Sequence, residues 1–296
     1  MASRIALARE ALRQAAALRR RLGLNRVDPI CIYDVLEERL GIEVKFQAIS
    51  SMEGMYVKAQ PPVIFVCSER PVGRQAYTCA HELAHHVFDH GSKVDEYFGS
   101  EEEANSFDPD EWLADRFAGF FLMPAHAVEK AFHTRGWQCQ TCDPFQLYVV
   151  AGNLGVGYET LIQHMRWSLG MLTDEQSKAC ARTTPKEIRE SILGKELTTR
   201  LLIVDRSWDN KVAADLQVGD KAILPAGLLL ECSVLRVVGE HRLGTLVEAK
   251  APGTEHAVFP DTAWGVNIRV SRRAYVGRSL FRHLEDPDYE PSIPNQ

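Results

Sequence analysis

Hydrophobic residues recur at helical spacing through most of the first 172 residues. Apolar positions three and four apart predict a helix over residues 4–22, which ends at Gly23, and a second over 32–40, which ends at Gly41. Further helical patterns cover residues 71–91, 110–123, 127–133 and 145–169. Short β-like runs lie between them, at residues 42–49, 54–57 and 63–67. This part of the chain is therefore expected to be a mixed α+β domain, with a polar loop at 92–109.

The pattern changes beyond residue 199. Short apolar runs are separated there by Gly, Pro, Asp and Asn, which predicts an all-β sandwich or barrel. The runs cover residues 201–204, 221–224, 228–238, 245–251 and 264–270. The polar stretch before them holds one more helix, which opens at Pro185. We therefore predict a domain at 1–172, a linker helix within 173–198 and a β-rich domain at 199–296.

Composition narrows the class of protein. A chain of 296 residues is long enough for two domains, and 45% hydrophobic with 25% charged residues is typical of a folded chain. The longest apolar runs, 118–123 and 226–230, are far shorter than the roughly 18–20 residues of a membrane span. Seven scattered cysteines and the lack of a signal sequence indicate a reducing, cytoplasmic location. A net charge of −6 argues against a protein that coats nucleic acid.

The strongest chemical motif is His81-Glu82-Leu83-Ala84-His85, inside the predicted helix 71–91. Residues four apart share a helix face, so His81 and His85 can both bind one zinc ion. Glu82 is then placed to act as the general base on water. The alternative is a surface helix with incidental His and Glu, which the helical context makes the weaker interpretation. His86 and His90 are expected to lie in solvent.

A hydrolytic zinc site needs a third protein ligand. A third histidine six residues after the second is excluded, because that position is Gly91. Glu111 and Asp115 share a face of the next long helix, so Glu111 can bind the metal while Asp115 accepts a hydrogen bond from a ligating imidazole. The alternative ligands, Glu101, Glu102 and Glu103, lie in a charge run that is typical of a solvated loop.

The sequence around the HExxH motif and Glu111 resembles the ImmA/IrrE family of metallopeptidases. The resemblance spans about residues 1–172 and rests on Arg70-Pro71-x-Gly73-Arg74-x-x-Tyr77-Thr78-x-Ala80-His81-Glu82-Leu83-Ala84-His85, Glu111-x-x-Ala114-Asp115-x-Phe117-Ala118 and Leu122-Met123-Pro124. It implies a zincin-like domain with a helix-turn-helix-like appendage, and a reaction that cuts one peptide bond of a helix-turn-helix repressor. It also implies a role in DNA-damage responses, mobile-element induction or antiphage operons, with the second domain as a sensor.

Residues 145–169 carry the apolar and glycine spacing of a helix-turn-helix. The second helix has little positive charge beyond Arg166, whereas helices that read bases need Arg, Lys, Asn or Gln aimed at the groove. Packing against the protease domain is therefore favoured over DNA reading.

Cys139 and Cys142 form a single C-x-x-C pair. Without a second pair it does not predict a structural zinc knuckle, and two ordinary loop cysteines are the simpler interpretation. The alternative is a thiolate that caps the catalytic zinc and inhibits it.

The β-rich domain ends in a basic strip that is interleaved with Trp264, Tyr275 and Phe281. Arginines beside aromatic rings are typical of grooves that bind single-stranded nucleic acid, although solvated surface arginines are more common. Single-stranded DNA or another anion is thus a possible activator for this strip, which consists of Arg269, Arg272, Arg273, Arg278 and Arg282.

The leading hypothesis is a zinc endopeptidase that cleaves a helix-turn-helix repressor, with the strand at 54–57 pairing with the extended substrate. The alternative hypothesis is a signal-responsive transcription regulator that uses the zincin domain as a scaffold. The presence of Glu82 together with three metal ligands favours the enzyme.

Overall fold

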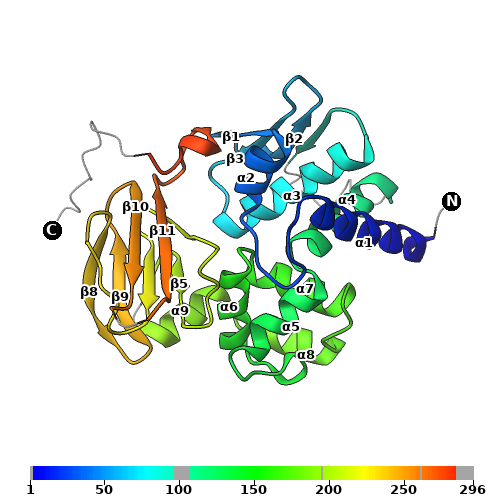
Figure 1. The fold of residues 1–296 in the computed structure, drawn as a ribbon. Coiled ribbons are helices and arrows are strands. Elements are labelled where there is room, and N and C mark those ends of the chain that lie inside the picture. The colour runs from blue at the N-terminus through cyan, green and yellow to red at the C-terminus, as the bar shows by residue number, and fades with distance from the viewer. Residues whose placement is uncertain (1–2, 97–106, 195, 261, 285–296) are drawn as a thin grey trace. The chain divides into compact units, whose positions relative to one another are not determined.

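The computed structural model describes residues 3–96, 107–194, 196–260 and 262–284. The chain forms two compact units (Figure 1). Unit 1 consists of Met1–Pro185 and Val276–Leu280, and unit 2 consists of Lys186–Tyr275 and Phe281–Gln296. Among the described residues, no helix is both long and apolar enough to cross a membrane.

Unit 1 contains a five-stranded mixed sheet in the order β12-β1-β3-β2-β4. The central pair β1 and β3 is parallel, whereas β2 runs antiparallel to both of its neighbours. The bounds are β1 Glu43–Gln47, β2 Met52–Val57, β3 Val63–Cys67, β4 Lys93–Glu96 and β12 Gly277–Arg278. Burial alternates along β1 and β2, so that one face of the sheet is covered.

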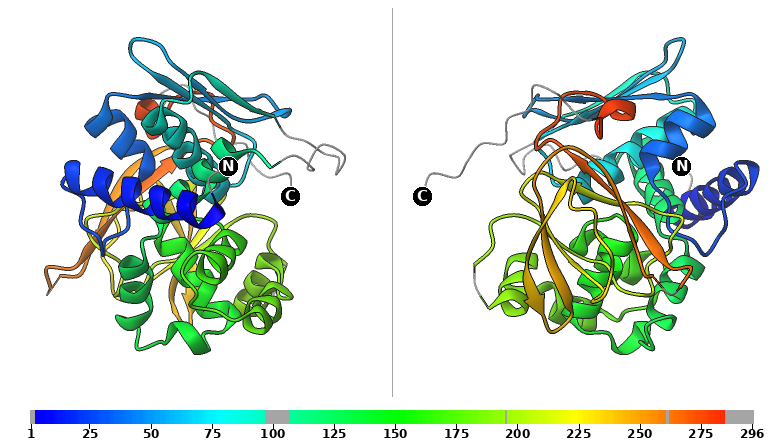
Figure 2. Two further views of the ribbon diagram at one scale, coloured as in Figure 1. Left: turned by 90° about the vertical axis from the view of Figure 1, so that its right-hand side faces the viewer. Right: turned by 60° about the vertical axis from the view of Figure 1, so that its left-hand side comes forward.

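Helices cover that face in layers (Figure 2). Helix α3 packs on β2 and β3, α4 packs on α3, and α1 packs on α4. Because α3 lies between the sheet and α4, its middle is buried on nearly all sides, from Gln75 to His85. The helices of unit 1 are α1 Arg4–Arg21, α2 Ile32–Asp34 with a π-helical turn Val35–Leu40, α3 Val72–Phe88, α4 Pro109–Leu122, α5 Ala125–His133, α6 Pro144–Asn153, α7 Tyr158–Trp167 and α8 Asp174–Ala181; α9 Pro185–Leu193 follows at the boundary.

Helix α7 contacts α3 and α4, and α6 packs on α7, so the helix pair packs within unit 1 as favoured from its sequence. A Cβ added at Gly73, in the first turn of α3, would lie 2.6 Å from the backbone nitrogen of Gly157, the residue before α7. The main chains of these two segments are therefore in contact. In α7, buried His164 donates from Nε2 to the carbonyl oxygen of Met123, at the end of α4, over 2.9 Å. Arg166 is paired with Asp174 in α8. The structure thus gives this helix pair a packing role within unit 1.

The structure differs from the sequence prediction at residues 92–109. Lys93–Glu96 form β4, which pairs antiparallel with β2 from Met52 to Tyr56. The reversal follows from Asp89 and Gly91, both of which have positive φ angles, 56° and 81°, and turn the chain back after α3. Since β3 and β4 pair with β2 on both sides, the prediction that strand 54–57 pairs with an extended substrate is wrong.

The boundaries of the units also differ from those predicted. The chain returns to unit 1 after residue 275, where β12 pairs antiparallel with β1 through Lys45 opposite Arg278. The carboxylate of Glu37 holds this returning segment, because it accepts hydrogen bonds from Arg278 Nη2 over 2.8 Å and from Ser279 Oγ over 3.1 Å. A domain limited to 1–172 would therefore lack one strand of its own sheet.

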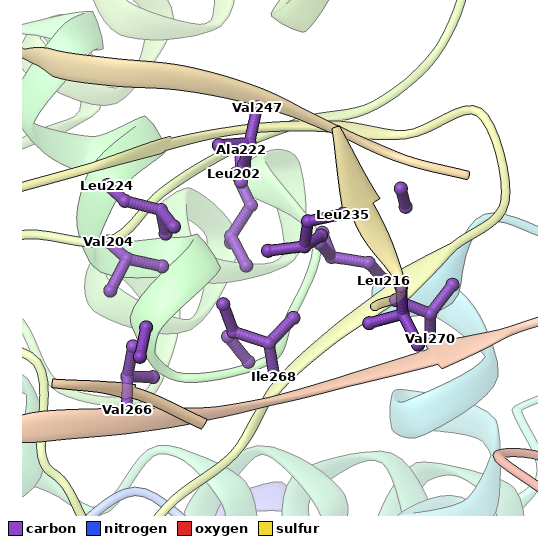
Figure 3. Packing of buried hydrophobic residues seen from close by; sticks show 14 of the residues in the cluster. Leu202, Val204, Leu216, Ala222, Leu224, Leu235, Val247, Val266, Ile268 and Val270 are labelled. Atoms are coloured by element: carbon purple, nitrogen blue, oxygen red, sulfur yellow. The ribbon is translucent and has the colours of Figure 1, made fainter. Parts of the chain in front are cut away.

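Unit 2 consists of two sheets around one apolar core (Figure 3). The strand orders are β10-β11-β6 and β5-β7-β9-β8, with bounds β5 Leu201–Ile203, β6 Ala214–Gln217, β7 Lys221–Leu224, β8 Leu235–His241, β9 Gly244–Ala249, β10 Gly253–Val258 and β11 Gly265–Ser271. Side chains from both sheets meet in this core, among them Leu202, Leu224, Val247, Val266 and Ile268. The predicted β-rich texture is confirmed, but β6 and β10 were not predicted.

Candidate metal centre

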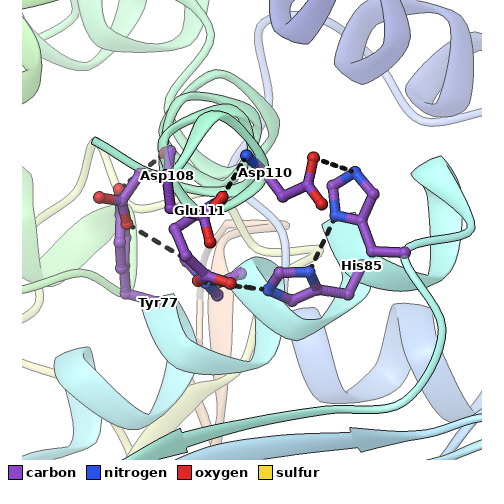
Figure 4. Close-up of polar contacts among 8 residues, drawn as sticks. Tyr77, His85, Asp108, Asp110 and Glu111 are labelled. Atoms are coloured by element: carbon purple, nitrogen blue, oxygen red, sulfur yellow. Dashed lines mark hydrogen bonds and ion pairs between the residues drawn. The ribbon is translucent and has the colours of Figure 1, made fainter. Parts of the chain in front are cut away.

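Helices α3 and α4 bring three ligand atoms to one point (Figure 4). His81 Nε2 lies 3.1 Å from Glu111 Oε2, and His85 Nε2 lies 3.2 Å from His81 Nε2. The third distance, from His85 Nε2 to Glu111 Oε2, is 3.6 Å. The structure therefore brings together the three residues that the sequence nominates as ligands.

The spacing of these atoms fits zinc. Tetrahedral zinc with bonds of about 2.0–2.1 Å holds neighbouring ligand atoms about 3.3–3.4 Å apart. The three observed distances, 3.1, 3.2 and 3.6 Å, bracket that value. Two imidazoles and one carboxylate also form the ligand set of hydrolytic zinc sites that keep one position open. His81, His85 and Glu111 would therefore hold zinc.

Glu111 is positioned by the start of α4. Asp108 caps this helix by accepting from the backbone nitrogens of Asp110, over 2.8 Å, and Glu111, over 3.4 Å. This cap fixes the first turn and directs Glu111 toward α3. Hydrogen bonds to His81 and then His85 hold the pKa of the Glu111 carboxyl well below its ordinary value, against the effect of burial. Glu111 is therefore an anion, as metal binding requires.

Asp115 lies one turn further along α4 and contacts His81. Its Oδ1 is 3.1 Å from His81 Nδ1, the nitrogen on the far side of the ring from the ligand atom. Tyr77 Oη donates to the carbonyl oxygen of Asp115 over 2.8 Å, and burial raises the pKa of Tyr77, so its hydroxyl keeps its proton. A carboxylate on Nδ1 fixes the tautomer that leaves Nε2 for the metal. The arrangement is the one expected for Asp115, whereas the contact of Tyr77 was not predicted.

Glu82 lies on the sheet side of α3. Its side chain is completely buried, and Oε1 lies so close to Gly54 of β2 that a Cβ there would collide with it. The same Cβ would also lie 2.5 Å from Cγ2 of Thr78. Gly54 is thus a site residue that the sequence prediction missed. A glycine in the middle of a strand signals close approach by another group, and that signal was available.

The structure contradicts the expectation that His86 and His90 lie in solvent. His90 Nδ1 is 3.0 Å from His85 Nδ1, and His86 Nδ1 is 2.8 Å from Tyr56 Oη. The His90 side chain is only 10% exposed. The cause is the turn at Asp89, which folds His90 back over the end of α3. No spacing rule for a continuous helix predicts this contact.

The alternative third ligands, Glu101, Glu102 and Glu103, lie outside the described residues. Within the described residues, the group that could hold a metal contains no cysteine, so the structure does not place Cys139 or Cys142 at the zinc site. Burial raises the pKa of both thiols, that of Cys142 to about 12, which disfavours a thiolate. The structure therefore favours two ordinary loop cysteines, and a thiolate cap on the metal stays a prediction.

Most arginines of the predicted basic strip are engaged with carboxylates. Arg269 binds Asp215 with two nitrogens, over 2.6 and 2.9 Å, and buried Arg282 approaches the same carboxylate at 3.5 Å. Arg273 pairs with Asp220, and Arg278 pairs with Glu37 in unit 1. These four side chains are therefore paired with carboxylates, although the Arg273 side chain is still 51% exposed. Binding of single-stranded DNA by unit 2 stays a prediction.

Comparison with known proteins identifies the segment that carries this site. Residues 37–165, from the π-helical turn to α7, match the family described as the IrrE N-terminal-like domain, Peptidase_M78. A solved Mycobacterium tuberculosis transcriptional regulator is 17% identical, with a TM-score of 0.34, over 53% of this chain and 46% of that one; the match thus spans less than half of the regulator. No curated protein matches the chain. The matched segment, which contains His81, His85 and Glu111 at ligand distance, is therefore similar to the IrrE N-terminal-like domain of the ImmA/IrrE family.

Proposed function

We propose that this protein is a zinc-dependent endopeptidase that cleaves a helix-turn-helix transcriptional repressor. The observation that carries the proposal is the meeting of His81 Nε2, His85 Nε2 and Glu111 Oε2 at 3.1–3.6 Å, with Glu82 adjacent in sequence to the first ligand. A scaffold has no need for a buried acid beside a complete ligand set, whereas hydrolysis needs both.

Zinc, when bound, polarises the scissile carbonyl and makes water a stronger acid. Glu82 then acts as the general base: its carboxylate accepts a proton from the attacking water and passes it to the amide nitrogen of the leaving peptide. Glu82 is completely buried, and the lack of a side chain at Gly54 leaves the space that this carboxylate needs. Asp115 keeps His81 in the tautomer that binds metal through Nε2.

The substrate segment binds in an extended form in this proposal. Among the strands of the described residues, β4 is the outermost on the β2 side of the sheet, so a substrate strand would add main-chain hydrogen bonds along β4. The proposed substrate, a repressor with a helix-turn-helix domain, is what the resemblance of residues 37–165 to the ImmA/IrrE family implies. Its cleavage would derepress a stress, DNA-damage or phage-defence operon.

The test is cleavage of the repressor encoded beside this protein's gene. Purified protein with zinc is incubated with the purified repressor, and intact-mass spectrometry locates the cut. We expect two fragments whose masses sum to that of the repressor plus one water, and no fragments with Glu82→Gln. A zinc-loaded protein that binds the repressor and leaves it intact would instead favour the scaffold hypothesis.

A further inference from the structure

A series of side-chain contacts runs from Asp110 through His90 to the proposed zinc ligand His85; Asp110 and His85 are labelled in Figure 4. His85 Nδ1 and His90 Nδ1 are 3.0 Å apart, and His90 Nε2 lies 3.6 Å from Asp110 Oδ1. The first and last residues of this series lie on the helices that carry the ligands, because His85 is on α3 and Asp110 directly precedes Glu111 on α4.

The positions of the protons in this series follow from the chemistry of imidazole. A histidine that binds zinc through Nε2 carries its proton on Nδ1, so His85 donates from Nδ1. The nitrogen opposite it, His90 Nδ1, must then be an acceptor. A neutral imidazole with an unprotonated Nδ1 carries its proton on Nε2, which here faces the carboxylate of Asp110. One assignment of the protons therefore fits both the contact between His85 and His90 and the contact between His90 and Asp110.

The position of His90 is built into the end of α3. Its backbone nitrogen donates to the carbonyl oxygen of His85 over 3.0 Å, which fixes the turn after the helix. Its ring stacks on Phe88 with centroids 5.6 Å apart and an interplanar angle of 16°. Phe88 in turn packs edge-on against Phe117 of α4. The ring of His90 is thus held by contacts that are independent of its hydrogen bonds.

We propose that His90 is a positioning residue of the zinc centre, which orients the His85 ring and fixes its tautomer, with Asp110 holding His90 in turn. The two ligating histidines then have different partners: His81 faces the carboxylate of Asp115 directly, whereas His85 faces a carboxylate only through a second imidazole. The proposal rests on the zinc site of the proposed function, but not on the identity of the substrate.

The test compares substitutions that separate hydrogen bonding from packing. His90→Phe keeps a ring on Phe88 and removes the acceptor, while His90→Asn restores an acceptor near the Nδ1 position. Asp110→Asn weakens the far end of the series. His126→Asn is the matched control, because His126 is 62% exposed on α5 and its contact is with Glu129.

The zinc dissociation constant is measured by competition with a chromophoric chelator. We expect His90→Phe to weaken zinc binding about 10- to 100-fold, which is the range for losing the partner of a ligating histidine. His90→Asn should recover most of that loss, Asp110→Asn should have a smaller effect, and His126→Asn should have none. The thermal midpoint of the metal-free protein checks that every variant folds.

A second readout is the tautomer of His85 in the zinc-loaded protein, read from long-range proton–nitrogen NMR spectra. We expect a protonated Nδ1 on His85 and a protonated Nε2 on His90. Wild-type affinity in His90→Phe, or an equal loss in His90→Asn, would overturn the proposal, as would the opposite tautomers. Failure to cleave a repressor, with these results intact, would count only against the proposed function.

Discussion

Glu82 and Gly54 fit together across the space between α3 and β2. The carboxylate of Glu82 occupies the position in which any larger residue at 54 would place its Cβ. Gly54 is hydrogen-bonded within the sheet, opposite Val66 of β3 and Asp95 of β4, so it cannot retreat easily. The proposed general base therefore lies against a strand that carries none of the three candidate metal ligands.

The first prediction concerns Gly54→Ala. The added methyl group must push the Glu82 carboxylate aside, and misplacement of a catalytic group by about 1 Å costs about 100-fold in rate. We expect cleavage to fall by at least about this factor while zinc binding stays near wild type. The measurement is kcat/KM for repressor cleavage together with the zinc dissociation constant.

The control for this substitution is Gly239→Ala in β8. It is also a glycine inside a strand, but a Cβ there meets nothing within 4 Å. Its cleavage rate should equal that of wild type. Equal activity of Gly54→Ala and Gly239→Ala would show that the close approach to Glu82 has no catalytic consequence.

Glu82→Gln is the second prediction. The amide keeps the size of the side chain but cannot accept a proton from water, and loss of a general base typically costs about 10²–10⁴-fold. Zinc content, measured by atomic absorption, should be unchanged because the ligands remain. His81→Ala should lose zinc as well as activity. Cleavage by Glu82→Gln at the wild-type rate would remove Glu82 from the mechanism.

The third prediction separates Glu111 from the acidic run. Glu111→Ala removes one of three ligands and should weaken zinc binding by more than the about 10- to 100-fold loss expected for an outer partner. The triple change of Glu101, Glu102 and Glu103 to Ala should leave the dissociation constant near wild type. The reverse pattern would transfer the third ligand to that run.

The fourth prediction concerns pH and His164. Burial lowers the pKa of this side chain from 6.5 to about 4, although its bond to Met123 opposes the shift. The unfolded chain therefore binds a proton at a higher pH than the folded one. The stability linked to His164 is fully present above pH 6.5 and is lost as the pH falls toward 4. A shift of this size corresponds to about 3 kcal/mol of unfolding free energy at most.

His164→Gln isolates this effect, because glutamine can still donate to Met123 but does not titrate. Urea unfolding of the metal-free proteins at pH 7, 5.5 and 4.5 gives the free energies. Wild type should lose more stability than His164→Gln over this range. Parallel losses in both proteins would show that His164 does not titrate as its burial requires.

The residues that were predictable from the sequence are those related by short, regular spacing. His81 and His85 are one turn apart on α3, and Glu111 and Asp115 are one turn apart on α4, so helix geometry alone placed each pair on one face. The β-rich content of unit 2 was also predictable, because short apolar runs between turn residues are typical of strands. Local periodicity carries this information without knowledge of the tertiary fold.

The contacts that the sequence did not predict depend on where the chain turns. His90 reaches His85 only because Asp89 adopts a left-handed conformation, and β4 pairs with β2 only after the same reversal. The arginines 269, 273, 278 and 282 gave a charge pattern, but their carboxylate partners lie between 50 and 250 positions away along the chain. Pairings at such distances are fixed by the fold and not by local pattern.

The pairing of β12 with β1 has a consequence for the order of folding during synthesis. Lys45 leaves the ribosome more than 200 residues before Arg278, its partner in the sheet. At about 5–20 residues per second, the outer edge of β1 stays open for tens of seconds while unit 2 is made. An open strand edge invites pairing with other chains. Unit 1 is therefore the first to begin folding, but its sheet closes at β1 only after residues 186–275 of unit 2 have been translated.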